Sequence, residues 1–293
     1  VEPRYVPVTV KEPLLTPEGM LAAIDENTIG VVGILGVTYT GAYEPIQALA
    51  EALDDLEART GRDVSLHVDA ASGGMVAPFI QPDLVWDFRL SRVHSINTSG
   101  HKYGLVYPGL GWVIWRDKEY LPEDLIFHVS YLGGDMPTLA LNFSRPGAQV
   151  LLQYYLFVRL GMDGYRTIHQ LSQNIALMLS RGIGAMEPFE LLTKGDELPV
   201  FAWRMKPGHT TNWDLQDLSE RLRLNGWQVP AYPMPDDISD VWVMRIVVRL
   251  GLLPSTANLL LKDIREAVTY LDALDGPMPR IGRTGKANRF TYS

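Results

Sequence analysis

The sequence predicts an α/β fold in which a mostly parallel sheet with flanking helices is joined to a smaller α+β unit at the C-terminal end. Two observations predict the sheet: apolar runs typical of buried strands alternate with segments of helical spacing, and the joints between them are short. Beyond about residue 187, strand-like and helical segments are mixed. We therefore expect a large unit over residues 1–150, connecting helices over 151–186 and a small unit over 187–293.

In the large unit, apolar spacing and turn residues define the elements. Gly30–Leu35 is an unbroken apolar run, which is typical of a buried strand. Glu44–Arg59 carries apolar residues at helical spacing and is followed by Gly61, a common helix terminator. The other expected elements are an extended Pro-rich entry over 1–17, a short helix over 17–26, and strands over 64–68, 93–96 and 111–115.

The second half begins with a long helical pattern over residues 146–186, with an expected break at Gly161–Gly164. The small unit is expected to contain strands over 200–205 and 241–248 and helices over 214–225 and 255–274. Asp275-Gly276-Pro277 then opens a tail that carries several basic residues.

Composition narrows the class of protein. Of the 293 residues, 46% are hydrophobic and 20% are charged, as in ordinary globular proteins. The formal net charge of −8 argues against nucleic acid or an anionic membrane as the main partner, so an anionic ligand would need a local cluster of cations. The absence of cysteine excludes disulfides, thiolate metal sites and a catalytic thiol, and we expect no metal site. No apolar run is long enough to span a bilayer, which makes the cytoplasm the default location. The sequence begins with Val1 rather than methionine, so we expect it to be a fragment.

Two tracts carry the strongest chemical signal. His67–Gly74 reads HVDAASGG and Ser99–Lys102 reads SGHK, and each follows a strand-like run. Because ligands gather at the carboxyl ends of parallel strands, Asp69 and Lys102 are expected to converge there. An acid and a lysine so placed could serve a pyridine cofactor, with the acid holding the ring nitrogen protonated and the lysine bonding the aldehyde.

Both residues also have a simpler interpretation. An acid at a strand end is often a cap for the next turn, and most lysines are solvated surface charges. At about 4 Å and an effective dielectric of about 20, however, a carboxylate gains roughly 4 kcal/mol from a pyridinium nitrogen, which is enough to keep that nitrogen protonated. A partly desolvated lysine among small residues, such as Lys102, can form a Schiff base.

Four further residues are candidates for the same site. His101 could donate to a cofactor phosphate or be an ordinary loop histidine. Thr38 could donate its hydroxyl to the cofactor or be a simple turn residue, and Ala71 is small, as a residue under a flat ring should be. Arg245 lies in an apolar strand pattern and needs an anionic partner, which would be either a structural ion pair or a substrate carboxylate.

Taken together, these motifs resemble the glutamate decarboxylases, of the fold-type I superfamily of pyridoxal-phosphate enzymes. The resemblance covers nearly the whole chain apart from its C-terminal end. The segments that carry it are GVTYTGAY (36–43), HVDAASGGMVAPF (67–79), VWDFR (85–89), SGHKYGLVYPGLGWVIW (99–115), YLGG (131–134), NFSRP (142–146) and LSERLRLNGWQVP (218–230).

The resemblance implies a partial fold-type I large domain with pyridoxal 5′-phosphate as cofactor. In it, Lys102 would be the Schiff-base lysine and Asp69 the partner of the pyridine nitrogen. Ser144 resembles the residue that reaches the phosphate from the neighbouring subunit, which implies at least a homodimer. Arg245 resembles the arginine that binds the substrate α-carboxylate, and Tyr131 lies in a loop that covers the active site in relatives. The residues implied around the cofactor are Thr38, Asp69, Ala71, Ser99, His101 and Lys102.

The implied reaction is that of a carbon–carbon lyase, which decarboxylates L-glutamate to 4-aminobutanoate (GABA) and CO₂. The chain departs from its relatives in lacking the upstream segment that supplies most of the phosphate cradle and the groups for the distal carboxylate. Ser130 also stands where some relatives carry an acid. The alternatives are another fold-type I decarboxylase or lyase, acting on an aromatic amino acid or a sphingoid-base phosphate, and an inactive fragment or a half-subunit that needs its other half.

Overall fold

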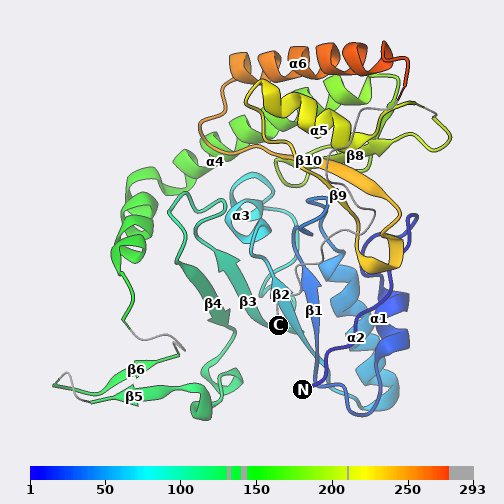
Figure 1. The fold of residues 1–293 in the computed structure, drawn as a ribbon. Helices are drawn as coiled ribbons and strands as arrows, with labels where there is room; N and C mark the ends of the chain where they lie inside the picture. Colours follow the sequence, from blue (N-terminus) through cyan, green and yellow to red (C-terminus); the bar gives the residue numbers. More distant parts are fainter. Residues whose placement is uncertain (131–132, 140–143, 210, 277–293) are drawn as a thin grey trace.

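The computed structural model describes residues 1–130, 133–139, 144–209 and 211–276 (Figure 1). Its larger sheet has the order β1 (Gly30–Ile34), β2 (Ser65–Asp69), β3 (Val93–Ser99) and β4 (Gly111–Trp115). The first three strands are parallel and β4 is antiparallel to β3. The predicted mostly parallel sheet with flanking helices is therefore confirmed, and the antiparallel edge strand is an addition to the prediction.

Helices cover one face of this sheet. Leu66 and Val68 of β2 belong to the same buried cluster as Leu49 and Leu53 of helix α2 (Ile46–Thr60). Helix α2 ends at Gly61, whose φ of +72° is the left-handed conformation that favours glycine at a helix end. The same unit contains α1 (Pro17–Ala23), the 3₁₀ turn η1 (Gly73–Met75) and α3 (Ala77–Ile80).

Helix α4 (Ala148–Gly184) connects the two units, as Figure 1 shows. Its backbone departs from helical geometry at Gly161, with φ 57° and ψ −166°, so the predicted break is confirmed. The elements before and after α4 are η2 (Lys118–Tyr120), η3 (Glu123–Leu125), β5 (Phe127–Val129), β6 (Met136–Thr138), β7 (Phe189–Leu191), β8 (Val200–Met205), α5 (Leu215–Leu224), β9 (Ala231–Pro233), η4 (Asp236–Ile238), β10 (Trp242–Val247) and α6 (Pro254–Asp272).

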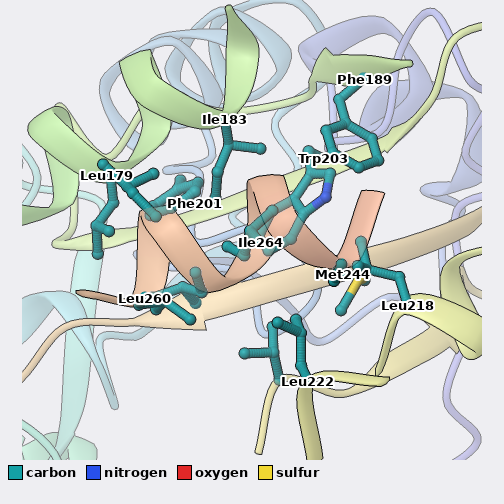
Figure 2. Packing of buried hydrophobic residues seen from close by; sticks show 14 of the residues in the cluster. Leu179, Ile183, Phe189, Phe201, Trp203, Leu218, Leu222, Met244, Leu260 and Ile264 are labelled. Atoms are coloured by element: carbon teal, nitrogen blue, oxygen red, sulfur yellow. The ribbon is translucent and has the colours of Figure 1, made fainter. Parts of the chain in front are cut away.

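The small unit is built on an antiparallel sheet of order β7-β8-β10-β9, and it has a hydrophobic core of its own. Figure 2 shows Trp203 of β8 and Met244 of β10 packed with Ile183 of α4 and Ile264 of α6. The predicted α+β character is confirmed. The strands β5, β6, β7 and β9 were not predicted, because three residues are too few to display an alternating pattern.

The two units are joined by contacts close to the carboxyl ends of β1 and β2. Val200 of β8 is buried in the core of the large unit. Glu197 Oε2 accepts a hydrogen bond from the Tyr43 backbone N–H at 2.9 Å, and the Glu197 carbonyl accepts one from Gln81 Nε2 at 2.8 Å. The predicted boundaries near residues 150 and 186 stay predictions, since β8 contributes to both cores.

One buried titratable group lies where α4 crosses the large unit. His169 is 1% exposed, and its ring packs against Phe79, Tyr165 and Tyr103. Burial lowers the pKa of His169 from 6.5 to about 4, although a hydrogen bond with the Met75 backbone opposes the shift. The unfolded chain therefore binds more protons than the folded one between these two values, and stability falls as the pH is lowered through this window.

We expect His169→Phe to remove this part of the acid sensitivity. The unfolding free energy of the wild type relative to the variant should fall by about 3 kcal/mol between pH 7 and pH 4, because each pKa unit corresponds to about 1.4 kcal/mol. Urea unfolding followed by circular dichroism at several pH values measures the difference. A difference that stays constant from pH 7 to pH 4 would contradict the assignment.

Candidate active site

The carboxyl ends of β1, β2 and β3 lie side by side, and the small unit lies beyond them (Figure 1). The strand register pairs Ile34 with Asp69, and Asp69 with Asn97. The turn after β1 contains Gly36, whose φ is +111°. A Cβ at this position would lie 2.6 Å from Leu198 Cδ1, so the turn needs glycine to admit the small unit so closely.

Asp69 ends strand β2 and is half-buried. Its Oδ1 accepts hydrogen bonds from the Ala71 backbone N–H at 3.0 Å and from Asn97 Nδ2 at 2.9 Å. The first bond is the turn cap that the simpler interpretation predicts. Among the residues that the structure describes, none donates to Oδ2, which leaves that oxygen free for a second role.

Lys102 lies in the turn after β3 and is also half-buried. Its Nζ donates to Ser72 Oγ at 3.3 Å, and Ser72 follows Asp69 by three residues. Its backbone N–H donates to the Ser99 carbonyl at 3.4 Å. The acid and the lysine therefore lie at the same end of the sheet, on adjacent strands, as the sequence predicts.

Helix α4 holds the lysine turn through a buried amide. Gln153 is 0% exposed, and its Nε2 donates to the Gly104 carbonyl at 2.9 Å. A Cβ on Gly100 or Gly104 would lie 2.7 or 2.6 Å from Gln153 Oε1. The two glycines on either side of the His101–Tyr103 segment thus allow α4 to approach the backbone of this turn.

A cavity of about 190 Å³ opens in front of Lys102. Of the described residues that line it, three carry positive charge, Lys102, Arg245 and Arg249, and none carries negative charge. This is the local cluster of cations that an anionic ligand would need in a protein of net charge −8. The other lining residues are Gly36, Val37, Thr38, Gly41, Ser72, Tyr103, Leu198, Val200 and Val247.

The two arginines come from β10 and the residues that follow it. Arg245 donates to the Thr38 carbonyl, and its guanidinium carbon lies 5.7 Å from the centre of the Tyr232 ring. No carboxylate of the described part of the chain pairs with Arg245, so the structure does not support a structural ion pair. Arg249 Nη2 donates to the His101 carbonyl at 2.9 Å, which ties the small unit to the lysine turn.

The side chain of His101 has a ring nitrogen whose hydrogen-bonding capacity is not used by the described residues. Its Nδ1 is buried and has no hydrogen-bond partner among the described residues. Burying a polar atom without a partner is costly, so this nitrogen, in the residue that precedes Lys102, fits a ligand with acceptor oxygens. Ser99 and Ala71 lie against each other nearby, since the Ser99 N–H donates to the Ala71 carbonyl at 3.2 Å.

The structure does not bring every predicted residue to this cavity. Thr38 lines it through an exposed position in the turn after β1. Ser144 is exposed, in the segment between β6 and α4, and does not line the cavity. Tyr131 lies outside the described residues, so its predicted role stays a prediction. Asp69, Ala71, Ser99 and His101 are not among the residues that line the cavity, and the roles of all the predicted residues stay predictions.

Ser72, Arg249 and Asn97 are among the residues at or beside the site that were not predicted. Ser72 lies inside the HVDAASGG tract, three residues after Asp69, and this short spacing could have marked it as a site residue. Arg249 follows Arg245 by four residues along an extended segment, and alternation places both on one side. Asn97 gives no signal in the sequence alone, because its contact with Asp69 depends on the register of two strands.

Comparison with known proteins places this site in a family. The family model described as the pyridoxal-dependent decarboxylase conserved domain matches residues 1–206. The glutamate decarboxylase of Aliivibrio fischeri is 52% identical over 271 residues, which are 92% of this chain and 58% of that protein. Glutamate decarboxylase beta of Listeria monocytogenes is 47% identical over 272 residues, which are 93% of this chain and 59% of that protein.

Solved structures give the same result for the fold. The glutamate decarboxylase of Lactobacillus brevis matches with a TM-score of 0.87 and 46% identity, over 92% of this chain and 61% of that one. A sphingosine-1-phosphate lyase of Burkholderia pseudomallei matches with a TM-score of 0.73 over 91% of this chain and 57% of that one, but at 24% identity it shows the fold alone.

The chain belongs to the pyridoxal-dependent decarboxylase family. Its fold is that of fold-type I enzymes, and the cofactor of the family is pyridoxal phosphate, so both expectations are confirmed at this level. The chain spans about three fifths of the length of the curated relatives it matches. No helix of the described residues is long and apolar enough to cross a membrane.

Proposed function

We propose that the protein containing this chain decarboxylates L-glutamate to 4-aminobutanoate and CO₂ with pyridoxal phosphate as cofactor. The observation that carries the proposal is the cavity in front of Lys102, which has cations from both units on its wall and an acid on the neighbouring strand end. Relatives that are 47% to 52% identical over more than nine tenths of this chain are named glutamate decarboxylases, which supports the choice of substrate.

The residues present fit the cofactor. The Lys102 amine would bond its aldehyde, Asp69 Oδ2 would accept a hydrogen bond from the protonated pyridine nitrogen, and a protonated His101 Nδ1 would donate to a phosphate oxygen. Once bound, the cofactor withdraws the electron pair that is left when a bond to the substrate α-carbon breaks. Thr38 and Ala71 would complete the wall around it.

In the proposed reaction, the protein's own side chains decide which bond breaks. Arg245, with Tyr232 beside it, would bind the α-carboxylate and hold the bond to that group perpendicular to the cofactor ring. The carbon–carbon bond then breaks, CO₂ leaves, and the α-carbon takes up one proton. Asp69 contributes by keeping the ring nitrogen protonated, which favours the departure of CO₂.

We also propose an assembly of at least two copies, in which Ser144 reaches the phosphate of the neighbouring subunit. The first half of α4 supports this: Leu151 is 71% exposed, Tyr154 70% and Val158 70%, and apolar surface of this kind marks an interaction site. We retain the cytoplasm as the proposed location, because the chain has no cysteine for the disulfides of oxidising compartments.

The function is tested by substrate profiling of the full-length protein with pyridoxal phosphate. We expect CO₂ release from glutamate and none from tyrosine or tryptophan. Release from an aromatic amino acid but not from glutamate would overturn the substrate assignment while leaving the family intact. Light scattering of the same preparation tests the assembly, and a monomer that retains full activity would refute it.

Lys102→Ala should abolish covalent attachment of the cofactor. Borohydride reduction followed by peptide mass spectrometry is expected to find the reduced cofactor on residue 102 in the wild type and nowhere in the variant. Turnover should fall by at least about 10³-fold, because the nucleophilic amine is lost. Lys118→Ala, which changes an exposed lysine away from the cavity, is the matched control and should behave as wild type. Wild-type turnover in the Lys102 variant would contradict the assignment.

Asp69→Asn should lower turnover by about two to three orders of magnitude, because a neutral amide no longer stabilises a protonated ring nitrogen. The fold should persist, since an amide oxygen can still accept from the Ala71 N–H and Asn97 Nδ2. Steady-state kinetics and circular dichroism measure the two effects. Asp83→Asn is a control outside the cavity wall. An unchanged rate in the Asp69 variant would show that the ring nitrogen needs no acid.

A further inference from the structure

A chain of polar side chains crosses β2 and β3 on one face of the large sheet. It consists of Ser95, His67, Asn97 and Asp69, whose register pairs His67 with Ser95 and Asp69 with Asn97. Because alternate residues of a strand share a face, these four point away from the apolar core that Leu66 and Val68 form on the other side. Packing alone does not explain four connected polar residues in the two central strands.

Each link in this chain is short. His67 Nδ1 lies 2.7 Å from Ser95 Oγ, and His67 Nε2 lies 2.7 Å from Asn97 Oδ1. Asn97 Nδ2 lies 2.9 Å from Asp69 Oδ1. The four side chains therefore form one continuous hydrogen-bonded path that ends on the carboxylate.

The chemistry of the end groups fixes the direction of every bond. An ionised carboxylate only accepts, so Asn97 must turn its NH₂ group toward Asp69 and its oxygen toward His67. That oxygen can only accept, so the proton of His67 must be on Nε2. If the ring is neutral, Nδ1 then accepts from the Ser95 hydroxyl. All donors in the path point toward Asp69.

The hydrogen-bonded path fixes the orientation of the Asp69 carboxylate. Asp69 Oδ1 is held by two donors, the Asn97 amide and the Ala71 N–H, while no described residue donates to Oδ2. Two bonds to one oxygen fix the rotation of the carboxylate about its own axis. Oδ2 is thereby left in a set direction for the donor that the site is built to receive.

We propose that His67 is a positioning residue for Asp69, acting through Asn97 to hold the carboxylate in the orientation that meets the cofactor nitrogen. His67 does not hydrogen-bond Asp69 directly, because the Asn97 side chain lies between the two. The proposal rests on the proposed function only for the identity of the group that faces Asp69. The direction of the hydrogen-bonded path does not depend on it.

The first test needs no cofactor. A nitrogen-15 NMR spectrum of the histidine rings, assigned by the signals missing in His67→Gln, reports which nitrogen of residue 67 carries the proton. We expect a protonated Nε2 in the wild type and in Ser95→Ala. A proton on Nδ1 alone would reverse the direction of the path and overturn the proposal, whatever the protein catalyses.

The second test uses the full-length protein and compares two replacements of His67. Phe removes the donor, whereas the Gln amide nitrogen can reach the place of Nε2 and donate to Asn97. We expect His67→Phe to weaken binding of pyridoxal phosphate about tenfold and to lower kcat about tenfold with little change in KM. His67→Gln should recover both to within about threefold of wild type.

His94→Phe is the control, because the ring of His94, on β3, stacks on Tyr120, and none of the hydrogen bonds of the path involves the His94 side chain. It should leave cofactor affinity and kcat unchanged. Equal losses in the Phe and Gln variants of His67, or unchanged affinity and kcat in the Phe variant, would overturn the positioning role. If the Phe variant fails to fold, the Gln variant and the NMR result decide. Failure of the wild type to bind pyridoxal phosphate would instead refute the proposed function.

Discussion

The parallel pairing of β2 with β3 is the constraint on which the site depends. It sets Asp69 of β2 opposite Asn97 of β3. Strand β3 ends two residues after Asn97, and the turn that contains Lys102 follows. A shift of one residue in this register would turn the polar side chains of one of the two strands, His67 and Asp69 or Ser95 and Asn97, toward the apolar core. The buried Leu66, Val68 and Ile96 on the other face resist such a shift, so the hydrophobic core fixes the geometry of the polar site.

A second constraint is the close approach of elements that are distant in the sequence. The small unit reaches the turn after β1 because Gly36 has no side chain, and α4 reaches the lysine turn because Gly100 and Gly104 have none. These contacts bring Arg245 and Arg249 to the cavity wall, although the chain as a whole carries a net charge of −8. The local field of the cavity is therefore opposite in sign to the net charge, which suits a ligand with phosphate and carboxylate groups.

Most of the fold was predictable, because long elements display their pattern. Gly111–Trp115 and Val200–Met205 were predicted with the observed bounds, and the break at Gly161 followed from glycine in a helical pattern. The direction of β4 was not predictable, since an apolar run reads the same whether its neighbour is parallel or antiparallel. Of the cavity's two arginines, only Arg245 was predicted, because apolar residues flank it on both sides in the strand pattern, whereas Arg249 stands at the end of that pattern.

By itself, the sequence determined the chemical inventory of this protein: an acid at one strand end, a lysine past the next, small residues around both, and no cysteine. It also determined the helices and the longer strands, because hydrophobic periodicity is a local property of the chain. Only the tertiary structure decided that Asn97 and His67 stand behind Asp69, that Lys102 Nζ donates to Ser72, and that no described residue pairs with the buried Nδ1 of His101. These facts depend on strand register and on the docking of the small unit, which are set by long-range packing and leave no local signature in the chain.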